Sequence, residues 1–274
     1  MKIFDCFLFF NELDLLELRL AELYDQVDFF VLVEANKTHT GKDKTFNFEE
    51  NISRYTPWMD KIIHVKVTDC PEYDSNHPEK IENFQRNAIM RGLTTSAQEG
   101  DKIMVSDVDE IPNMKVVSEH LHKCFGTNWM HFQCDLFYYY VNCQVLQGFG
   151  GVTVAAYDTF TSCPQRLRMM TIRKGNYNND CNTVIIHAGW HYSYLCGGNP
   201  QVIRTKAENI FESYGLINAL GTDDNIREKI KKHVDPYGRS SRRRKETIVD
   251  ISHNKPKYLD EWLLKFPQYF YKET

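Results

Sequence analysis

The stretch KIMVSDVDEIP, residues 102–112, joins a short apolar run directly to three acidic residues and ends at a proline. An apolar run of this length, bounded by turn residues, is typical of a buried β-strand. Alternate residues of an extended segment point to the same side. The sequence therefore predicts that Asp107 and Asp109 present their carboxylates to one point at the mouth of this strand, with Glu110 beside them, while Val108 faces inward.

Comparable apolar runs precede this strand and alternate with helical patterns. Strands are predicted within KIFDCFLFF (2–10), VDFFVLVEAN (27–36) and KIIHVKV (61–67), and helices within ELDLLELRLAELYD (12–25) and EKIENFQRNAIMRGL (79–93). In the first helix Leu16, Leu20 and Leu23 share one face, and Asn11 is expected to cap it with Asp14 in the first turn. This alternation favours an α/β fold with a mostly parallel central sheet that is flanked by helices.

Ligands of such sheets bind beyond the carboxyl ends of the strands. Asn11, Glu34 and Asp107 each follow or end a predicted strand. We therefore expect these three side chains to converge on one crevice.

The second part of the chain changes character after Pro112. A helix is predicted within NMKVVSEHLHKCFG (113–126), one long aromatic strand within NWMHFQCDLFYYYVN (128–142), a strand within GGVTVAAYD (150–158), and a strand that runs into a glycine-rich bend within NTVIIHAGWHYSYLCGG (182–198). From Pro200 onward the composition is helical and charged. Because no linker is evident, we expect a single domain over residues 1–274, with a nucleotide-binding α/β half (1–112), an acceptor and metal half (113–199) and a helical C-terminal segment (200–274).

Composition limits the class of protein. The 274 residues carry a formal net charge of −4, which argues against nucleic acid as the main partner. No window reaches the roughly 18 apolar residues of a membrane span, and acids appear too early for a signal peptide, so a cytoplasmic chain without stable membrane insertion is expected. The eight cysteines form no CxxC pair, so neither a zinc ribbon nor a thioredoxin-like site is indicated.

The neighbouring aspartates indicate a metal site. Two carboxylates held close together repel each other unless a cation lies between them or one is protonated. Mg²⁺ and Mn²⁺ prefer oxygen ligands and leave positions open for substrate phosphates. Arg86 and Asn87 precede the acids by about twenty residues, a spacing that a helix and a turn return to the same crevice. A guanidinium there would pair with a phosphate through two hydrogen bonds.

Six segments occur in order along nearly the whole chain: FNELDLL, VLVEAN, ENFQRNAI, VSDVDEIP, AGWHYSYLCGG and PKYL. Together they resemble glycosyltransferase family 17, the family of β-1,4-mannosyl-glycoprotein 4-β-N-acetylglucosaminyltransferase. The resemblance implies a GT-A type, Rossmann-like fold and a UDP-sugar donor, with UDP-GlcNAc expected first. It also implies dependence on Mn²⁺ or Mg²⁺, inversion at the anomeric carbon, and a glycan as acceptor.

The resemblance also suggests roles for individual residues. Asp109, helped by Asp107, would hold the metal, and His191 in the GWH element would complete its shell or contact the diphosphate. Glu34 would bind the uridine or its ribose. Independently of the resemblance, Trp190 or the tyrosines 138–140 are candidates to stack on a sugar ring, although aromatic residues in strands more often belong to the core.

Inversion in one displacement requires a carboxylate that deprotonates the acceptor hydroxyl. Four acids are candidates for this role, with Glu110 first: Glu110, Asp135, Asp158 and Asp180. Glu110 adjoins the metal acids but precedes Ile-Pro, which is compatible with a fixed loop position instead. The sequence does not determine which side of its strand the Asp135 side chain faces. It also does not decide among the four candidates.

Two other functions compete with this interpretation. A haloacid-dehalogenase-type phosphatase also carries a DxD strand, with Asp107 as the nucleophile and GTDDN (221–225) as later metal acids, but such enzymes usually begin with that strand. A metal-dependent glycan-binding protein would bind saccharides without turning over a donor. The basic run RSSRRRK (239–245) is more typical of a solvated loop than of a ligand site.

Overall fold

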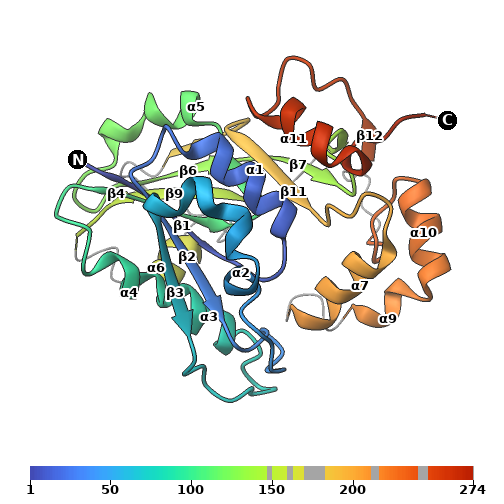
Figure 1. Cartoon of the computed structure of the whole chain (residues 1–274), viewed down its shortest axis with the longest axis horizontal. Coiled ribbons are helices and arrows are strands. Elements are labelled where there is room, and N and C mark those ends of the chain that lie inside the picture. Colours follow the sequence, from blue (N-terminus) through green and yellow to red (C-terminus); the bar gives the residue numbers. More distant parts are fainter. Residues whose placement is uncertain (147–149, 159–162, 170–182, 211–215, 240–245, 274) are drawn as a thin grey trace.

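The computed structural model describes residues 1–146, 150–158, 163–169, 183–210, 216–239 and 246–273. Within these ranges twelve strands form two sheets (Figure 1). The larger sheet has the order β10 (Thr183–Ile185), β6 (Trp129–Gln133), β9 (Gly151–Ala156), β4 (Lys102–Asp107), β1 (Ile3–Leu8), β2 (Phe29–Ala35) and β3 (Ile62–Val67). The smaller sheet has the order β12 (Glu246–Ile248), β8 (Cys143–Val145), β7 (Asp135–Tyr138), β11 (Gly189–Ser193) and β5 (Glu110–Pro112).

The larger sheet is mostly parallel, as the alternation of strands and helices predicts. β1 lies between β2 and β4, and Cys6 pairs in register with Val31 on one side and Val105 on the other. β9 runs antiparallel between β4 and β6, and β10 is parallel to β6. The predicted α/β fold is therefore confirmed.

Helices cover both faces of the larger sheet, because its central strands are apolar on both sides. One face packs against α1 (Leu13–Leu23), α5 (Met114–Ser118) and the 3-10 helix η1 (Ile52–Lys61), which follows α2 (Asn47–Glu50). The other face packs against α3 (Lys80–Asn87), α4 (Ile89–Leu93) and α6 (Pro164–Met169). Leu16, Leu20 and Leu23 are fully buried against the first face, as their spacing predicts.

Helix α1 also contacts the smaller sheet and so lies between the two sheets (Figure 1). Its Leu15 and Leu18 join a second apolar cluster with Trp190 and with Trp262 of α11 (Leu259–Lys265). The opposite face of the smaller sheet packs against α7 (Pro200–Asn209), α9 (Ile217–Leu220) and α10 (Asp223–Lys231). These helices confirm the helical C-terminal segment. The short 3-10 helices η2 (Leu121–Lys123) and η3 (Pro267–Tyr269) complete the described elements.

Three segments cross from the larger sheet to the smaller one. β4 continues into β5 after a turn at residues 108–109, β6 into β7 at Cys134, and β10 into β11 through residues 186–188. The predictions of one aromatic strand over 128–142 and one strand over 182–198 are therefore wrong. The register of β6 with β9 ends at Gln133 opposite Gly151, and from Asp135 the chain pairs with β11 instead.

The start of α1 also differs from the prediction. Glu12 and not Asn11 occupies the N-cap position, and no side chain caps the helix. The Glu12 Oε2 atom accepts hydrogen bonds from the preceding backbone N–H groups of Asn11 (3.0 Å) and Phe10 (3.3 Å). These two bonds hold the Glu12 carboxylate beside the carboxyl end of β1.

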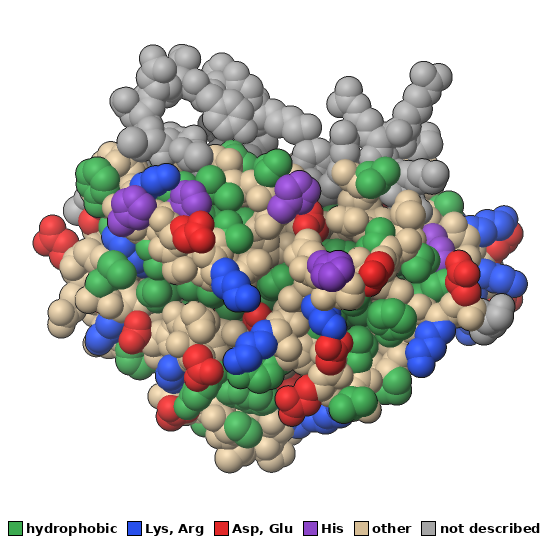
Figure 2. Space-filling view, turned by 90° about the horizontal axis from the view of Figure 1, so that it is seen from above, with side chains coloured by type: hydrophobic (Ala, Val, Ile, Leu, Met, Phe, Trp, Pro, Cys, Tyr) green, Lys and Arg blue, Asp and Glu red, His purple; other side chains and the backbone are tan. Residues whose placement is uncertain are grey.

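Charges on the surface are mixed. Basic and acidic side chains lie close to one another on the face shown in Figure 2, as the near balance of 33 basic and 37 acidic residues suggests. No helix in the described ranges is both long and apolar enough to cross a membrane.

Candidate active site

A cavity of about 990 Å³ lies where the two sheets meet, beyond the carboxyl ends of β1, β2 and β4. Its described lining comes from the end of β1, the loop after β2, α3, the β4–β5 turn, β6, Gly150, α6, β10, β11 and α7. A volume of this size is suited to a large organic ligand. The cavity lies at the edge of the sheet where the strand order predicts ligand binding.

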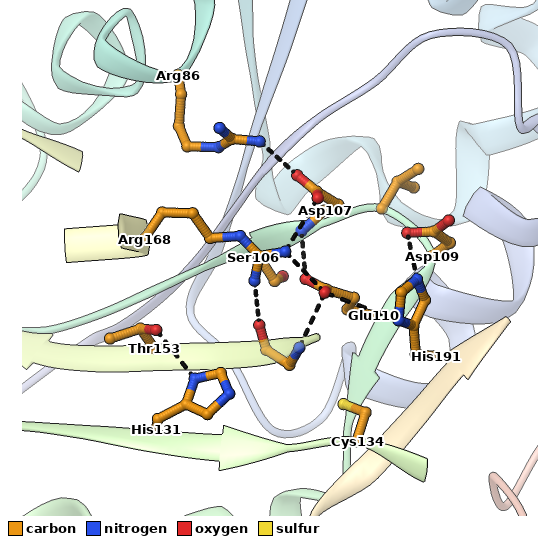
Figure 3. A network of polar contacts seen from close by, with 12 residues as sticks. Arg86, Ser106, Asp107, Asp109, Glu110, His131, Cys134, Thr153, Arg168 and His191 are labelled. Atoms are coloured by element: carbon orange, nitrogen blue, oxygen red, sulfur yellow. Dashed lines mark hydrogen bonds and ion pairs between the residues drawn. The ribbon is translucent and has the colours of Figure 1, made fainter. Parts of the chain in front are cut away.

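The turn between β4 and β5 separates the two aspartates. In Figure 3 the Asp107 carboxylate points toward Arg86, whereas the Asp109 carboxylate points toward His191. The prediction that both carboxylates meet at one point is therefore wrong. Alternation holds along an extended strand, but β4 ends at Asp107 and a turn follows. Val108 is 3% exposed and packs inward, as predicted.

Arg19 of α1 fixes the backbone of this turn through hydrogen bonds. It is fully buried and donates to both carboxylate oxygens of Asp5 in β1, at 2.8 Å from Nε and 2.6 Å from Nη2. Its Nη1 donates to the backbone carbonyl oxygens of Asp107 (3.0 Å), Val108 (3.2 Å) and Glu110 (2.8 Å). The rigid fork of a guanidinium suits such convergent acceptors. Arg19 thereby fixes the backbone that carries the acidic side chains.

The Glu110 carboxylate also fixes the backbone of this turn. Its Oε2 accepts from the Asp107 amide (2.9 Å), and its Oε1 accepts from the Gly151 amide (2.8 Å) and from Arg168 (2.8 Å). The Glu110 side chain is completely buried. Both oxygens are therefore occupied, and the structure contradicts the prediction of Glu110 as the catalytic base.

Two arginines bind Asp107. Arg86 donates to its Oδ1 at 2.8 Å and Arg168 to its Oδ2 at 3.1 Å. Burial raises the pKa of Asp107, but the positive charges of Arg168 and Arg86 outweigh that effect and hold the pKa well below its usual range. Arg86 thus reaches the crevice as its spacing predicts, with a carboxylate as its partner.

Asp109 has a different pair of partners. The Lys206 Nζ of α7 lies 2.7 Å from its Oδ2, and the His191 Nε2 of β11 lies 3.6 Å from its Oδ1. Burial raises the pKa of Asp109, but Lys206 and His191 lower it far more. Burial lowers the pKa of His191, but Asp109 and Glu110 raise it above its ordinary value. Asp109 raises the pKa of Lys206 as well, so Asp109, His191 and Lys206 all favour their charged forms.

The donor set suits a metal ion that takes few ligands from the protein. No group of three or more His, Cys, Asp or Glu side chains in the described part of the chain could hold a metal ion. Asp109 and His191, however, lie side by side on the cavity lining. Mg²⁺ is typically bound by one or two carboxylates together with substrate phosphates. Asp109 and His191 would hold such an ion once His191 has lost its proton and the Lys206 ammonium has moved away from Asp109, whereas Asp107 is bound by two arginines.

Two of the predicted donor-binding residues belong to the protein interior. Glu34 is fully buried and accepts from Lys44 Nζ (3.1 Å) and from the Phe48 amide (3.2 Å). Trp190 is 3% exposed, packs in an apolar cluster and donates from Nε1 to the Asn254 carbonyl oxygen (3.2 Å). Neither is among the described residues that line the cavity. Their predicted contacts with the donor are therefore contradicted by this placement.

Three more predicted residues lie beside the cavity but not on its described lining. Asn11 lines a smaller neighbouring cavity. The Asn87 Oδ1 accepts from the Gln165 amide (3.0 Å), so Asn87 supports α6. Asp135 bonds to His187 Nδ1 at 2.7 Å and is not on the described lining, so this placement does not support it as a base in the cavity. Asp158 is not on the described lining either, and Asp180 lies outside the described residues.

Sequence reasoning missed four charged residues of this region. Arg19 carries a signal, because it lies on the same helical face as Leu16, Leu20 and Leu23 and a charge among buried positions needs a partner. Glu12, Arg168 and Lys206 carry no comparable signal. Their roles depend on contacts between segments that are far apart in the sequence.

A model of one protein family, described as Glycosyltransferase family 17, matches residues 1–198. No curated protein matches the chain. The match includes β1 to β11 and ends just before α7, so Lys206 lies beyond it.

We expect Arg19→Met to lower the free energy of unfolding by about 3–5 kcal/mol, because it leaves the Asp5 carboxylate buried without its partner. The double variant Asp5→Leu/Arg19→Met recovers most of that loss, yet hydrogen–deuterium exchange at the 108–110 amides becomes faster than in the wild type. Urea unfolding and exchange measured by mass spectrometry test both effects. Lys232→Met, which breaks an exposed ion pair with Glu228, is the matched control and costs less than about 1 kcal/mol. Equal costs for Arg19→Met and Lys232→Met would contradict the assignment.

We also expect a pH dependence from His131, which lines the cavity and is 7% exposed. Burial, assisted by Arg168, lowers the pKa of His131 to about 3. The unfolded chain binds a proton at this histidine below about pH 6.5 and the folded chain does not, so stability falls by about 1.4 kcal/mol per unit as the pH drops from 6.5 toward 3. Urea unfolding between pH 4 and 7 gives the free energy of unfolding at each pH. The slope of this free energy against pH should be smaller by this amount in His131→Gln than in the wild type. The exposed His122→Gln is the control, and identical slopes for His131→Gln and the wild type would refute the account.

Proposed function

The chain belongs to glycosyltransferase family 17, and we propose that it transfers GlcNAc from UDP-GlcNAc to a glycan hydroxyl with inversion at the anomeric carbon. Its family makes it a glycosyltransferase, which acts on a sugar donor and an acceptor. The proposal includes a GT-A type architecture in which residues 1–112 bind the nucleotide, residues 113–199 carry the acceptor and metal functions, and residues 200–274 form a helical addition.

The observation that supports a uridine nucleotide is a set of unsatisfied polar atoms on the cavity lining, whereas the choice of GlcNAc rests on the resemblance to the family. His39 Nδ1, Asn83 Oδ1 and Arg86 Nε are buried without a hydrogen-bond partner among the described residues. Buried polar atoms in folded proteins are almost always paired, so a ligand is the natural partner of such a group. A uracil ring offers one N–H donor and two carbonyl acceptors, which match an amide oxygen and a guanidinium N–H.

The charges of the cavity support a divalent ion. Six acidic and five basic side chains belong to its described lining: Glu12, Glu79, Glu82, Asp107, Asp109 and Glu110, and Lys37, Lys44, Arg86, Arg168 and Lys206. A nucleoside diphosphate adds further negative charge to a lining that has no positive excess. We therefore propose Mn²⁺ or Mg²⁺ as the cofactor, held by Asp109 and His191, with Asp107 orienting Arg86 and Arg168. The ion would neutralise the charge that develops on the leaving diphosphate.

The side chains of this site have distinct tasks in the proposed reaction. Arg168 and Arg86 are held on the cavity lining by Asp107, and their positive charge would attract the diphosphate. Arg19 and Glu110 hold the turn between β4 and β5, which we call the clamped turn. It keeps Asp109 in place without reorganisation during the reaction, and this is the condition for effective electrostatic stabilisation. The Gly150 backbone has φ +121°, and a Cβ there would collide with Glu110 and His191, so a glycine is required at this point of the lining.

The competing phosphatase function does not fit the structure. Thr222 of the GTDDN segment caps α10, and Asp223 forms an ion pair with Arg204 at 2.8 Å. Neither aspartate of this segment is on the described lining of the cavity. The later metal acids that such a phosphatase needs are therefore not supplied by GTDDN.

The proposal is tested by measuring UDP release from a panel of UDP-sugars with and without Mn²⁺. We expect UDP-GlcNAc to give the fastest release and to raise the melting temperature in the presence of Mn²⁺. Asp109→Asn should lower release on the order of 100-fold, because several kcal/mol of charge stabilisation depend on the ion. Mn²⁺ binding, followed by electron paramagnetic resonance, should be lost in Asp109→Asn and retained in Asp107→Asn.

Asp224→Asn is the control for these variants. The Asp224 side chain is 90% exposed and far from the cavity lining, so release should equal that of the wild type. Unchanged release in Asp109→Asn would contradict the role of Asp109. If no UDP-sugar is bound or hydrolysed by the wild type, the proposed donor is wrong.

A further inference from the structure

A second cavity, of about 320 Å³, adjoins the first. The two share four lining residues: Glu12, Asp109, Tyr194 and Lys206. The second cavity therefore lies directly behind the wall that carries Asp109. A molecule in the second cavity would therefore lie next to Asp109 and Lys206, which also line the larger cavity.

The lining of the second cavity suits a saccharide. It combines the uncharged polar side chains of Asn11, Asn199, Gln201 and Thr205 with aromatic and aliphatic groups that include Tyr269 and Val202. Sugars present hydroxyl groups at their edges and apolar C–H groups on their faces. Tyrosine provides both a ring face and a hydroxyl, so it suits such a ligand.

Tyr194 on the shared wall has an unusual conformation. Its backbone φ is +52°, a region that non-glycine residues rarely occupy, and the Lys206 Nζ lies 5.4 Å from the centre of its ring. Such conformations persist where the surrounding structure enforces them, and they cluster at functional sites. This observation does not depend on the chemistry of the lining. It concerns the wall that Tyr194 shares between the two cavities.

We propose that the second cavity binds the acceptor saccharide, and that Glu12 accepts the proton of the attacking hydroxyl. The inference rests on the proposed glycosyl transfer and adds the acceptor site and the base. Glu12 is suited to the task because its Oε2 is held by two backbone N–H groups, whereas no described residue donates to its Oε1. Burial, with Asp109 nearby, raises the pKa of Glu12, although Lys206 opposes this effect.

The proposed step is a single displacement at the anomeric carbon of the donor sugar. The acceptor oxygen forms a bond to the anomeric carbon of the donor sugar, and the bond from that carbon to the diphosphate oxygen breaks. The electron pair of the broken bond leaves with the diphosphate, and the hydroxyl proton passes to the Glu12 carboxylate. One displacement inverts the anomeric configuration.

Six of the fifteen described lining residues of the second cavity lie outside the matched part of the family. Asn199, Gln201, Val202, Thr205 and Tyr269 follow residue 198, where the family match ends. These residues would select the acceptor, whereas the larger cavity is built mostly from the matched part. We infer that the acceptor preference of this chain is determined by α7 and the C-terminal segment.

The binding part is tested on a glycan array with terminal mannose, galactose, glucose and N-acetylglucosamine, in the presence of UDP and Mn²⁺. The wild type should be retained by at least one glycan. Val202→Trp fills the cavity and should weaken retention at least about tenfold, with no change in the melting-temperature shift produced by UDP. Leu264→Trp, at a residue that is 85% exposed on α11, adds equal bulk elsewhere and should behave as the wild type.

The proton-transfer part is tested with Glu12→Gln. Retention on the array and the UDP-induced shift should persist, while transfer of GlcNAc to the retained glycan falls on the order of 100-fold or more. Glu50→Gln, on the surface, is the control and keeps the wild-type rate.

The outcomes separate this inference from the proposed function. Wild-type turnover of UDP-GlcNAc without retention on any glycan, or full retention of Val202→Trp, would overturn the acceptor site. A full transfer rate in Glu12→Gln would overturn the base. Absence of any UDP-sugar binding or hydrolysis in the wild type would instead refute the proposed donor.

Discussion

The buried ion pair between Arg19 and Asp5 determines where the acidic side chains of this protein lie. Removing two charges from water is costly, and the cost is offset here because the guanidinium is hydrogen-bonded to a carboxylate, to the Ser106 hydroxyl and to backbone carbonyl oxygens. Helix α1 lies between the two sheets and presents Arg19 where β4 passes into β5. The main effect of the pair is therefore to fix the backbone of the turn in one position. Its net contribution to stability is smaller. Glu110 completes the clamp from the opposite side.

This clamp divides the two aspartates between different cations. Asp107 is bound by two arginines and Asp109 by Lys206 and His191, so each carboxylate is charged at neutral pH without its neighbour. The pair is thus not a single metal-binding unit. In the proposed function Asp107 orients Arg86 and Arg168, and a metal ion at Asp109 takes the place of the Lys206 ammonium. Lys206 lies beyond the matched part of the family, which links the site to the C-terminal helices.

Strand and helix positions in residues 1–112, and the edge of the sheet where the larger cavity lies, were predictable because they depend on local periodicity and on the ends of apolar runs. Arg86 was predictable for the same reason, since a helix and a turn connect it to β4. The placement of Glu34 and Trp190 was not, because a polar or aromatic residue at a strand end can face either the core or the crevice. Alternation failed after Asp107, where the chain turns between two sheets. Partners that come from distant segments, such as Lys206, leave no local pattern in the sequence.

The central claim is that the clamped turn places Asp109 against the diphosphate of a nucleotide-sugar. A crystal structure of the protein with Mn²⁺ and a non-hydrolysable UDP-GlcNAc analogue tests it most directly. The account predicts the diphosphate in the larger cavity, with Asp109 and His191 next to the metal ion and the uracil near Asn83. A nucleotide bound outside this cavity, or a metal ion held away from Asp109, would contradict it.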